Sequence, residues 1–333
     1  MQTLNEIRKQ IKNIQGLKSI VRTMKMLASV SIRQYERATV ALSDYHRTTE
    51  LGLQAILKDY TDIRSRSGSD LKKKIGAIVL GSDQGMCGQF NEQISSFSLE
   101  TLRRMGYPSD QCQVLSVGSH PATRMVAAGQ PVADILHAPT MASAIRFTVQ
   151  EIIQRVEQWR TDGIVDEIYL FHNRLISSSV FRPQSNLFWP IDLEQFKDLK
   201  QRPWPTNKLP LHTMDSNLLL LNLISQHLFV VLSLALAESL AAENTSRLLA
   251  MQVAERNIND RLVELTAYYH QQRQISITSE LLDVISGAEI LAAQQIPLGK
   301  VKLKPPFKNG AKPEIDAGEV PVLLRPLLSK ITP

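Results

Sequence analysis

The chain has 333 residues, of which 43% are hydrophobic, and it carries a formal net charge of +6. This composition excludes a fully disordered protein, and the length allows two domains. Cys87 and Cys112 are the two cysteines, so a disulfide framework is excluded and a reducing compartment is expected. The amino-terminal residues lack the apolar core of a signal peptide, which argues against secretion.

The first segment predicts a long basic helix. Residues 1–67 contain no proline and only Gly16 and Gly52 as glycines. Steps of three and four, with one skipped residue near Gly16, separate the apolar or small residues Leu4, Ile7, Ile11, Ile14, Leu17, Val21, Met24, Ala28, Ser31, Tyr35, Ala38, Leu42 and Tyr45. Such a seam is typical of a coiled coil and requires a partner helix. The basic residues can attract nucleic acid, anionic lipid or an acidic protein surface, although charge alone favours a solvated face.

The middle of the chain predicts an α/β fold. Short apolar runs at 75–80, 112–117 and 167–172 suit buried strands, and 91–105 and 141–160 suit the helices between them. A further strand is expected at 180–192, at an edge of the sheet because of Pro183 and Pro190. Strands that alternate with helices indicate a small open sheet with crossover helices.

The glycine-rich segment Gly81–Gly88 follows the first predicted strand and precedes a helix. That position suits a loop whose backbone N–H groups hold phosphate, but the segment lacks the Lys-Ser/Thr ending of a P-loop and the dinucleotide spacing. A structural turn is therefore favoured. Cys87 has no evident His or Asn companion, which disfavours a catalytic thiol. The seven histidines show neither a helical pair nor a cysteine companion, so no metal site is predicted.

The third segment predicts a second long helix, because neither glycine nor proline occurs between Pro210 and Gly287. A helix of that extent would be about 110 Å long at 1.5 Å per residue. Its apolar stripe comprises Leu234, Leu248, Leu262, Leu265, Tyr269, Ile275, Leu282, Ile285 and Ala288. Residues 218–237 carry no charge and are numerous enough to span a membrane, but polar residues interrupt them, and a buried helix is the favoured interpretation. The Pro- and Lys-rich stretch 297–333 predicts an extended or disordered extension.

Several motifs, distributed in order along residues 1–292, resemble those of one family. They are Met24-Lys25-Met26 within 20–28, the turn at 81–91, the stretches 237–243 and 247–251, and, most specifically, 273–289. By these motifs the chain resembles the γ subunit of rotary F-type ATP synthases. Gln84, Thr23 and Gln271 depart from the family pattern, and no paired-cysteine regulatory insert is present, so thiol control is not expected. The resemblance leaves two questions open: whether the chain belongs to a main or a secondary F-type ATPase, and whether the coupling ion is a proton or sodium.

The resemblance implies an α/β fold class in which both termini form a long antiparallel two-helix coiled coil, the rotor shaft, from residues 1–60 and 212–296. Residues 72–195 would form a small open Rossmann-like domain. The implied partners are the α and β subunits, the ε subunit and the membrane ring of c subunits, on the cytoplasmic face of a bacterial inner or thylakoid-type membrane.

The subunit would be non-catalytic, without a cofactor or a metal, and would couple ion flow to conformational change at β. The implied subunit-contact residues are Arg8, Lys9, Arg22, Met24, Lys25, Arg273, Gln274, Thr278 and Glu280. Two other interpretations stay open: a nucleotide-handling enzyme that uses Gly81–Gly88, and a basic coiled-coil protein that binds nucleic acid.

Overall fold

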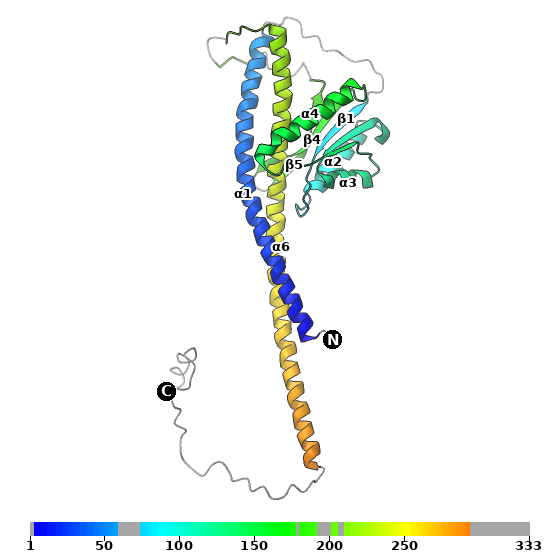
Figure 1. The fold of residues 1–333 in the computed structure, drawn as a ribbon, viewed down its shortest axis with the longest axis vertical. Coiled ribbons are helices and arrows are strands. Elements are labelled where there is room, and N and C mark those ends of the chain that lie inside the picture. The colour runs from blue at the N-terminus through cyan, green and yellow to red at the C-terminus, as the bar shows by residue number, and fades with distance from the viewer. Residues whose placement is uncertain (1–2, 59–73, 178–179, 192–200, 206–209, 294–333) are drawn as a thin grey trace, which may run out of the picture. The chain divides into compact units, whose positions relative to one another are not determined.

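A computed structural model describes residues 3–58, 74–177, 180–191, 201–205 and 210–293 (Figure 1). Contacts divide the chain into two units, residues 1–272 and 273–333. The extension predicted at 297–333 lies outside the described residues.

Helix α1 (Leu4–Leu57) begins at a capping box. The Thr3 hydroxyl accepts a hydrogen bond from the Glu6 backbone N–H, and the Glu6 carboxylate accepts one from the Thr3 N–H. These bonds satisfy two amide groups that have no partner within a helix. The long helix predicted for the first segment is confirmed.

The seam of α1 differs from the predicted one at two positions. Leu17 and Tyr45 are exposed, whereas Lys18 and His46 are half-buried. With Lys18 in place of Leu17 the alternation of four and three passes through Gly16, and two successive steps of three fall at Lys18, Val21 and Met24 instead, so the predicted position of the interruption is wrong. A lysine occupies a seam position because its aliphatic stem packs while its ammonium reaches water.

Helix α6 (Ser216–Ala293) lies alongside α1 and runs in the opposite direction (Figure 1). Arg22 bonds to Glu255, the rings of His46 and His227 lie 5.1 Å apart, and Gly52 lies against Leu223. The α6 partner number falls as the α1 number rises, so the two helices are antiparallel. The predicted pairing of the two terminal segments is confirmed for the first unit.

The middle segment forms one five-stranded sheet in the order β3-β2-β1-β4-β5. All neighbours are parallel except β5, which pairs antiparallel with β4 at the edge. The strands are β1 (Ile75–Leu80), β2 (Cys112–Val117), β3 (Asp134–Leu136), β4 (Glu167–Ser177) and β5 (Val180–Trp189). The predicted edge position of the 180–192 strand is correct, and that strand ends at Trp189.

Helices α2 (Phe90–Arg104), α3 (Ser119–Ala127) and α4 (Ile145–Thr161) connect the parallel strands. Neither α3 nor the short strand β3 was predicted from the sequence. Pro121 stands in the first turn of α3, where a missing N–H costs no helical hydrogen bond. The proline therefore does not interrupt this helix.

Each face of the sheet has its own apolar core. On one face, α2 and α3 pack on Ile75, Val79 and Val114. On the other face, α4 and α6 share a larger cluster that joins Ile78 and Leu170 to the leucines of α6 and to Tyr35 of α1. The shaft helix α6 is thus also a layer of the α/β domain.

Helix α6 contains a window long and apolar enough to cross a membrane, and 22% of that window is buried. Val230 and Leu232 lie in the core, whereas Leu218 and Leu221 are 51% and 63% exposed. The expected burial of residues 218–237 therefore holds toward the end of this segment and fails at its start.

Candidate functional site

The loop of residues 81–89 leaves the carboxyl end of β1 and lies where the sheet meets α6. Asp83 ties this loop to its neighbours, because its carboxylate accepts hydrogen bonds of 2.8 Å from the backbone N–H groups of Ser119 and Ala138. Partial burial of Asp83 opposes ionisation, but these bonds outweigh it and lower the pKa of the carboxyl. Gly118 has a φ of +95°, and a Cβ there would lie 2.7 Å from the Ser82 backbone. Only glycine permits this close approach.

Asn91, in the first turn of α2, holds the loop in shape from inside. Its side-chain oxygen accepts from the Ser82 N–H at 3.1 Å, and its amide nitrogen lies 2.8 Å from the Ser82 hydroxyl and 3.3 Å from the Cys87 sulfur. The expectation that Cys87 has no Asn companion is therefore wrong. Burial raises the pKa of the Cys87 thiol, which disfavours the reactive thiolate. The Cys87–Asn91 contact is structural.

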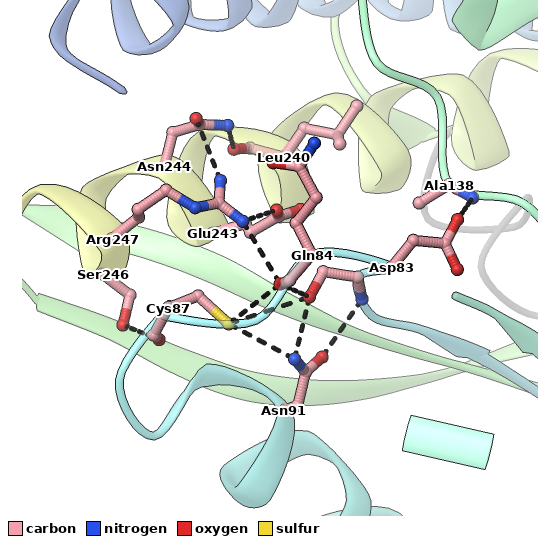
Figure 2. Close-up of polar contacts among 11 residues, drawn as sticks. Asp83, Gln84, Cys87, Asn91, Ala138, Leu240, Glu243, Asn244, Ser246 and Arg247 are labelled. Atoms are coloured by element: carbon pink, nitrogen blue, oxygen red, sulfur yellow. Dashed lines mark hydrogen bonds and ion pairs between the residues drawn. The ribbon is translucent and has the colours of Figure 1, made fainter. Parts of the chain in front are cut away.

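Arg247 of α6 reaches the loop from the other side, and Figure 2 shows its guanidinium between Glu243 and Gln84. Its Nη2 lies 2.6 Å from the Glu243 carboxylate and donates to the Gln84 carbonyl oxygen at 3.3 Å. Its Nη1 donates to the Asn244 side-chain oxygen at 3.3 Å. The Arg247 and Glu243 side chains are only 7% and 8% exposed. Burial raises the pKa of Glu243, and the nearby Arg247 opposes that rise.

Two serines of α6 add direct bonds to the β1 end. The Ser246 hydroxyl donates to the Cys87 carbonyl oxygen at 2.6 Å (Figure 2), and the Ser239 hydroxyl donates to the Leu80 carbonyl oxygen at 3.4 Å. Gly88 adopts a φ of +57°, and a Cβ there would lie 3.1 Å from the Ser246 hydroxyl. A side chain at position 88 would therefore crowd the Ser246 hydroxyl, so glycine allows the loop to pack closely against α6.

These contacts leave Gly81–Gly88 unsuited to phosphate. A phosphate cradle presents backbone N–H groups to its ligand, but this loop presents the carbonyls of Gln84 and Cys87 to donors on α6. Among the residues with described positions, no group of three or more His, Cys, Asp and Glu side chains is placed to hold a metal ion. The geometry is that of a joint between two parts of the chain.

The predicted contact residues on α1 lie in different surroundings. Arg8 and Lys9 are exposed. Arg22 and Lys25 both bond to Glu255 of α6, so these two cations stabilise the helix pair. Hydrogen bonds from Lys25 and then Arg22 lower the pKa of Glu255 to about 2. Met24 is half-buried and lines a cavity of about 310 Å³, which also touches Arg247.

The predicted contact residues on α6 are all exposed: Arg273, Gln274, Thr278 and Glu280. They share the second unit with large apolar side chains that are also exposed: Ile275, Ile277, Leu281, Leu282, Val284, Ile285 and Ile290. The predicted apolar stripe is therefore buried or half-buried from Leu234 to Tyr269 and exposed at Ile275, Leu282 and Ile285. This exposed surface suits a partner outside the chain.

The profile of the family described as ATP synthase matches residues 3–291. The ATP synthase γ chain of Nitrosomonas eutropha is 25% identical over 300 residues, which cover 86% of this chain and 99% of that relative. The γ chain of Azobacteroides pseudotrichonymphae is 26% identical over 309 residues, 87% of this chain and 100% of that relative. The chain belongs to the ATP synthase γ family.

Solved structures agree on the fold of this ATP synthase γ family member. A chain in the cryo-EM structure of the Euglena gracilis mitochondrial ATP synthase (OSCP/F1/c-ring, rotational state 3) is 16% identical and superposes with a TM-score of 0.64, over 90% of this chain and 98% of that chain. A chain of the same enzyme's rotor in rotational state 1 is 14% identical, with a TM-score of 0.58 and coverage of 82% and 98%. Neither comparison supports the nucleotide-handling or nucleic-acid-binding interpretation.

In this γ-family chain, no role was predicted from the sequence for Glu243, Arg247, Ser246 or Asn91. A signal existed for two of them, because Glu243 and Arg247 stand four residues apart on a predicted helix, the spacing of a helical ion pair. That spacing is common on solvated helices. The burial that makes the pair informative is visible only in the structure.

Proposed function

We propose that this chain is the rotating central-stalk subunit of an F-type ATP synthase, which couples ion flow through the membrane ring to conformational change at the catalytic β subunits. In this proposal the shaft is assigned to residues 1–60 and 212–296, the α/β domain to residues 72–195, and an extension to residues 297–333, which lie outside the described residues. The observation that carries this proposal is the antiparallel pairing of α1 with α6, supported by the family match over residues 3–291.

In this proposal the γ-type chain performs no bond chemistry and binds no cofactor. A single asymmetric shaft presents a different face to each β subunit, so each catalytic site favours a different state. Shifting a two-state site from 1:99 to 99:1 requires about 5.5 kcal/mol of differential interaction. Several contacts must therefore change in each step, which suits a long helical surface better than a single residue.

The proposed partners are the α and β subunits around the shaft, the ε subunit and the c-ring. The complex would lie on the cytoplasmic face of a bacterial inner or thylakoid-type membrane. Among the proposed contact residues, Arg273 and Gln274 are the strongest candidates for a contact with β. Both side chains are exposed, and both can donate several hydrogen bonds to a loop of β.

Reconstitution tests this function. The purified chain should hydrolyse no ATP alone, and with α and β subunits it should restore ATP-driven rotation in single-molecule assays. The Arg273→Ala/Gln274→Ala variant should weaken rotation and coupling, whereas Arg103→Ala, an exposed change on α2, should not. An assembled complex that hydrolyses ATP at an unaltered rate without any rotation would contradict the proposal.

A further inference from the structure

We propose that Glu243 and Arg247 are positioning residues that fasten the α/β domain to α6, so that the domain turns together with the shaft. The inference rests on the proposed rotor function and assigns a part of it to two residues outside the predicted contact set.

The first observation is the chemistry of the α6 face that meets the sheet. Glu243, Asn244, Ser246 and Arg247 are between 6% and 8% exposed. Burying polar and charged groups costs free energy unless each finds a partner. Glu243 and Asn244 find their partners within α6, whereas Ser246 and one N–H of Arg247 bond to the Cys87 and Gln84 carbonyls of the loop after β1. The cost of burying these two donors is therefore offset only while the domain stays seated on the helix.

The second observation is how Glu243 directs Arg247. The Glu243 carboxylate neutralises the guanidinium and accepts from Nη2, while Asn244 accepts from Nη1. The Asn244 amide in turn donates to the Leu240 carbonyl at 2.9 Å, which fixes Asn244 on the helix. The guanidinium is therefore held in one orientation, with an N–H directed at the Gln84 carbonyl. A planar, preorganised donor of this kind gives directional bonds.

The third observation is that the loop end of the contact is also held. Asn91 of α2 bonds to Ser82 and to Cys87 of the loop, and Asp83 bonds across to the backbone at Ser119 and Ala138. These bonds restrain the loop at several points. A force applied by Arg247 at Gln84 is therefore transmitted to the sheet.

The surrounding contacts explain why such a fastening is needed. Leu80, Leu236, Leu240 and Ala241 form an apolar interface between the sheet and α6. Apolar burial opposes separation of the two surfaces, but it is non-directional and defines rotation about the helix axis poorly. Hydrogen bonds have defined angles and distances. The bonds from Ser239, Ser246 and Arg247 therefore fix the angular position of the domain on the shaft.

The test compares Arg247→Met with Arg261→Met. Arg261 is the matched control, because it forms a pair with Glu264 on the same helix, but both side chains are more than half exposed. Hydrogen exchange of the full chain reports the fastening directly. For Arg247→Met, exchange in residues 81–89 should rise about ten- to a hundredfold, the effect of losing a hydrogen bond to a charged group. For Arg261→Met it should stay at the wild-type rate.

Function is read in the complete complex as the ratio of ATP-driven ion pumping to ATP hydrolysis. Arg247→Met should lower this ratio while hydrolysis continues, because the shaft turns without carrying the domain at a fixed angle. Ser246→Ala provides a second variant should Arg247→Met fail to fold. It removes the bond to the Cys87 carbonyl without changing the charge. It should raise hydrogen exchange in residues 81–89 and lower the pumping-to-hydrolysis ratio, each by a smaller factor than Arg247→Met.

The two proposals fail in different ways. If exchange in 81–89 is unchanged in the variants, or if it rises while the pumping-to-hydrolysis ratio stays at the wild-type value, the positioning role is overturned. If the wild-type chain itself restores no pumping, the rotor function fails instead. Even then, the difference in hydrogen exchange between Arg247→Met and Arg261→Met would still show whether Arg247 holds the loop.

Discussion

Helix α6 carries two contact surfaces of opposite character. Residues 238–247 are largely polar and mostly buried, and their polar groups bond to other parts of the same chain. Residues 273–290 include large apolar side chains and are mostly exposed. A buried polar surface with internal partners serves a fixed joint, whereas an exposed apolar surface serves a partner outside the chain. One helix thus combines a buried polar surface, proposed here as a joint, with an exposed apolar surface, proposed as a contact for another subunit.

The largest expected effect comes from removing one half of the buried pair. Glu243→Leu should lower the free energy of unfolding by about 3–5 kcal/mol, because it leaves the Arg247 charge buried without its counter-ion. The matched change Glu264→Leu breaks an exposed pair and should cost about 0–1 kcal/mol. Denaturant unfolding of the full chain measures both. Equal costs for the two variants would mean that the buried joint is no stronger than a surface pair.

A smaller effect is expected on acidification where α1 meets α6. Burial and then the neighbouring His46 lower the pKa of His227 from 6.5 to about 4. The folded chain therefore resists protonation that the unfolded chain accepts. The stability contribution is complete above pH 6.5 and is lost as the pH falls toward 4.

We expect this loss to amount to about 1–2 kcal/mol, after allowance for solvent screening at a partly exposed ring. His227→Gln should flatten the dependence of the unfolding midpoint on pH within this window. His270→Gln, an exposed change on the same helix, should leave the wild-type slope. A steep slope that persists in the His227 variant would place the acid sensitivity elsewhere.

A third prediction concerns the cluster of Arg22, Lys25 and Glu255. The two cations lower the pKa of Glu255 from 4.5 to about 2. Their stabilising contribution is present above pH 4.5 and is lost as the pH falls toward 2. Glu255→Gln should remove this acid-dependent part and weaken the salt dependence of unfolding. Glu100→Gln, at an exposed pair on α2, is the control, and the same response from both variants would argue against a specific role for Glu255.

The smallest effect is expected on the exposed surface. Ile277→Ser and Leu281→Ser should change the free energy of unfolding of the isolated chain by no more than about 0.5 kcal/mol, because both side chains are already about half exposed. Leu236→Ala in the core should cost about 2–5 kcal/mol. In the assembled complex the two serine variants should bind less tightly. A large loss of stability in the isolated chain would show that the chain itself covers these residues.

Sequence patterns predicted the strands best where the strand is a continuous apolar run. The first two strands coincide with the predicted segments 75–80 and 112–117, because a strand buried on both faces needs apolar residues throughout. Strand β3 has only three residues and helix α3 contains Pro121, so neither has a distinct local pattern. The seam of α1 was misread at Lys18 and His46, because a polar residue at a seam position does not mark itself as buried.

By itself, the sequence determined that both ends of the chain form long helices and that the middle alternates strand and helix. Local preferences and repeating apolar positions suffice for this, because proline is absent and glycine is rare where the helices continue. Only the tertiary structure decided that the polar residues of 238–247 are buried and that Ile277 and Leu281 are exposed. The reason is physical: burial depends on which distant segments come together, and the polar or apolar character of a helix segment does not by itself specify its neighbours.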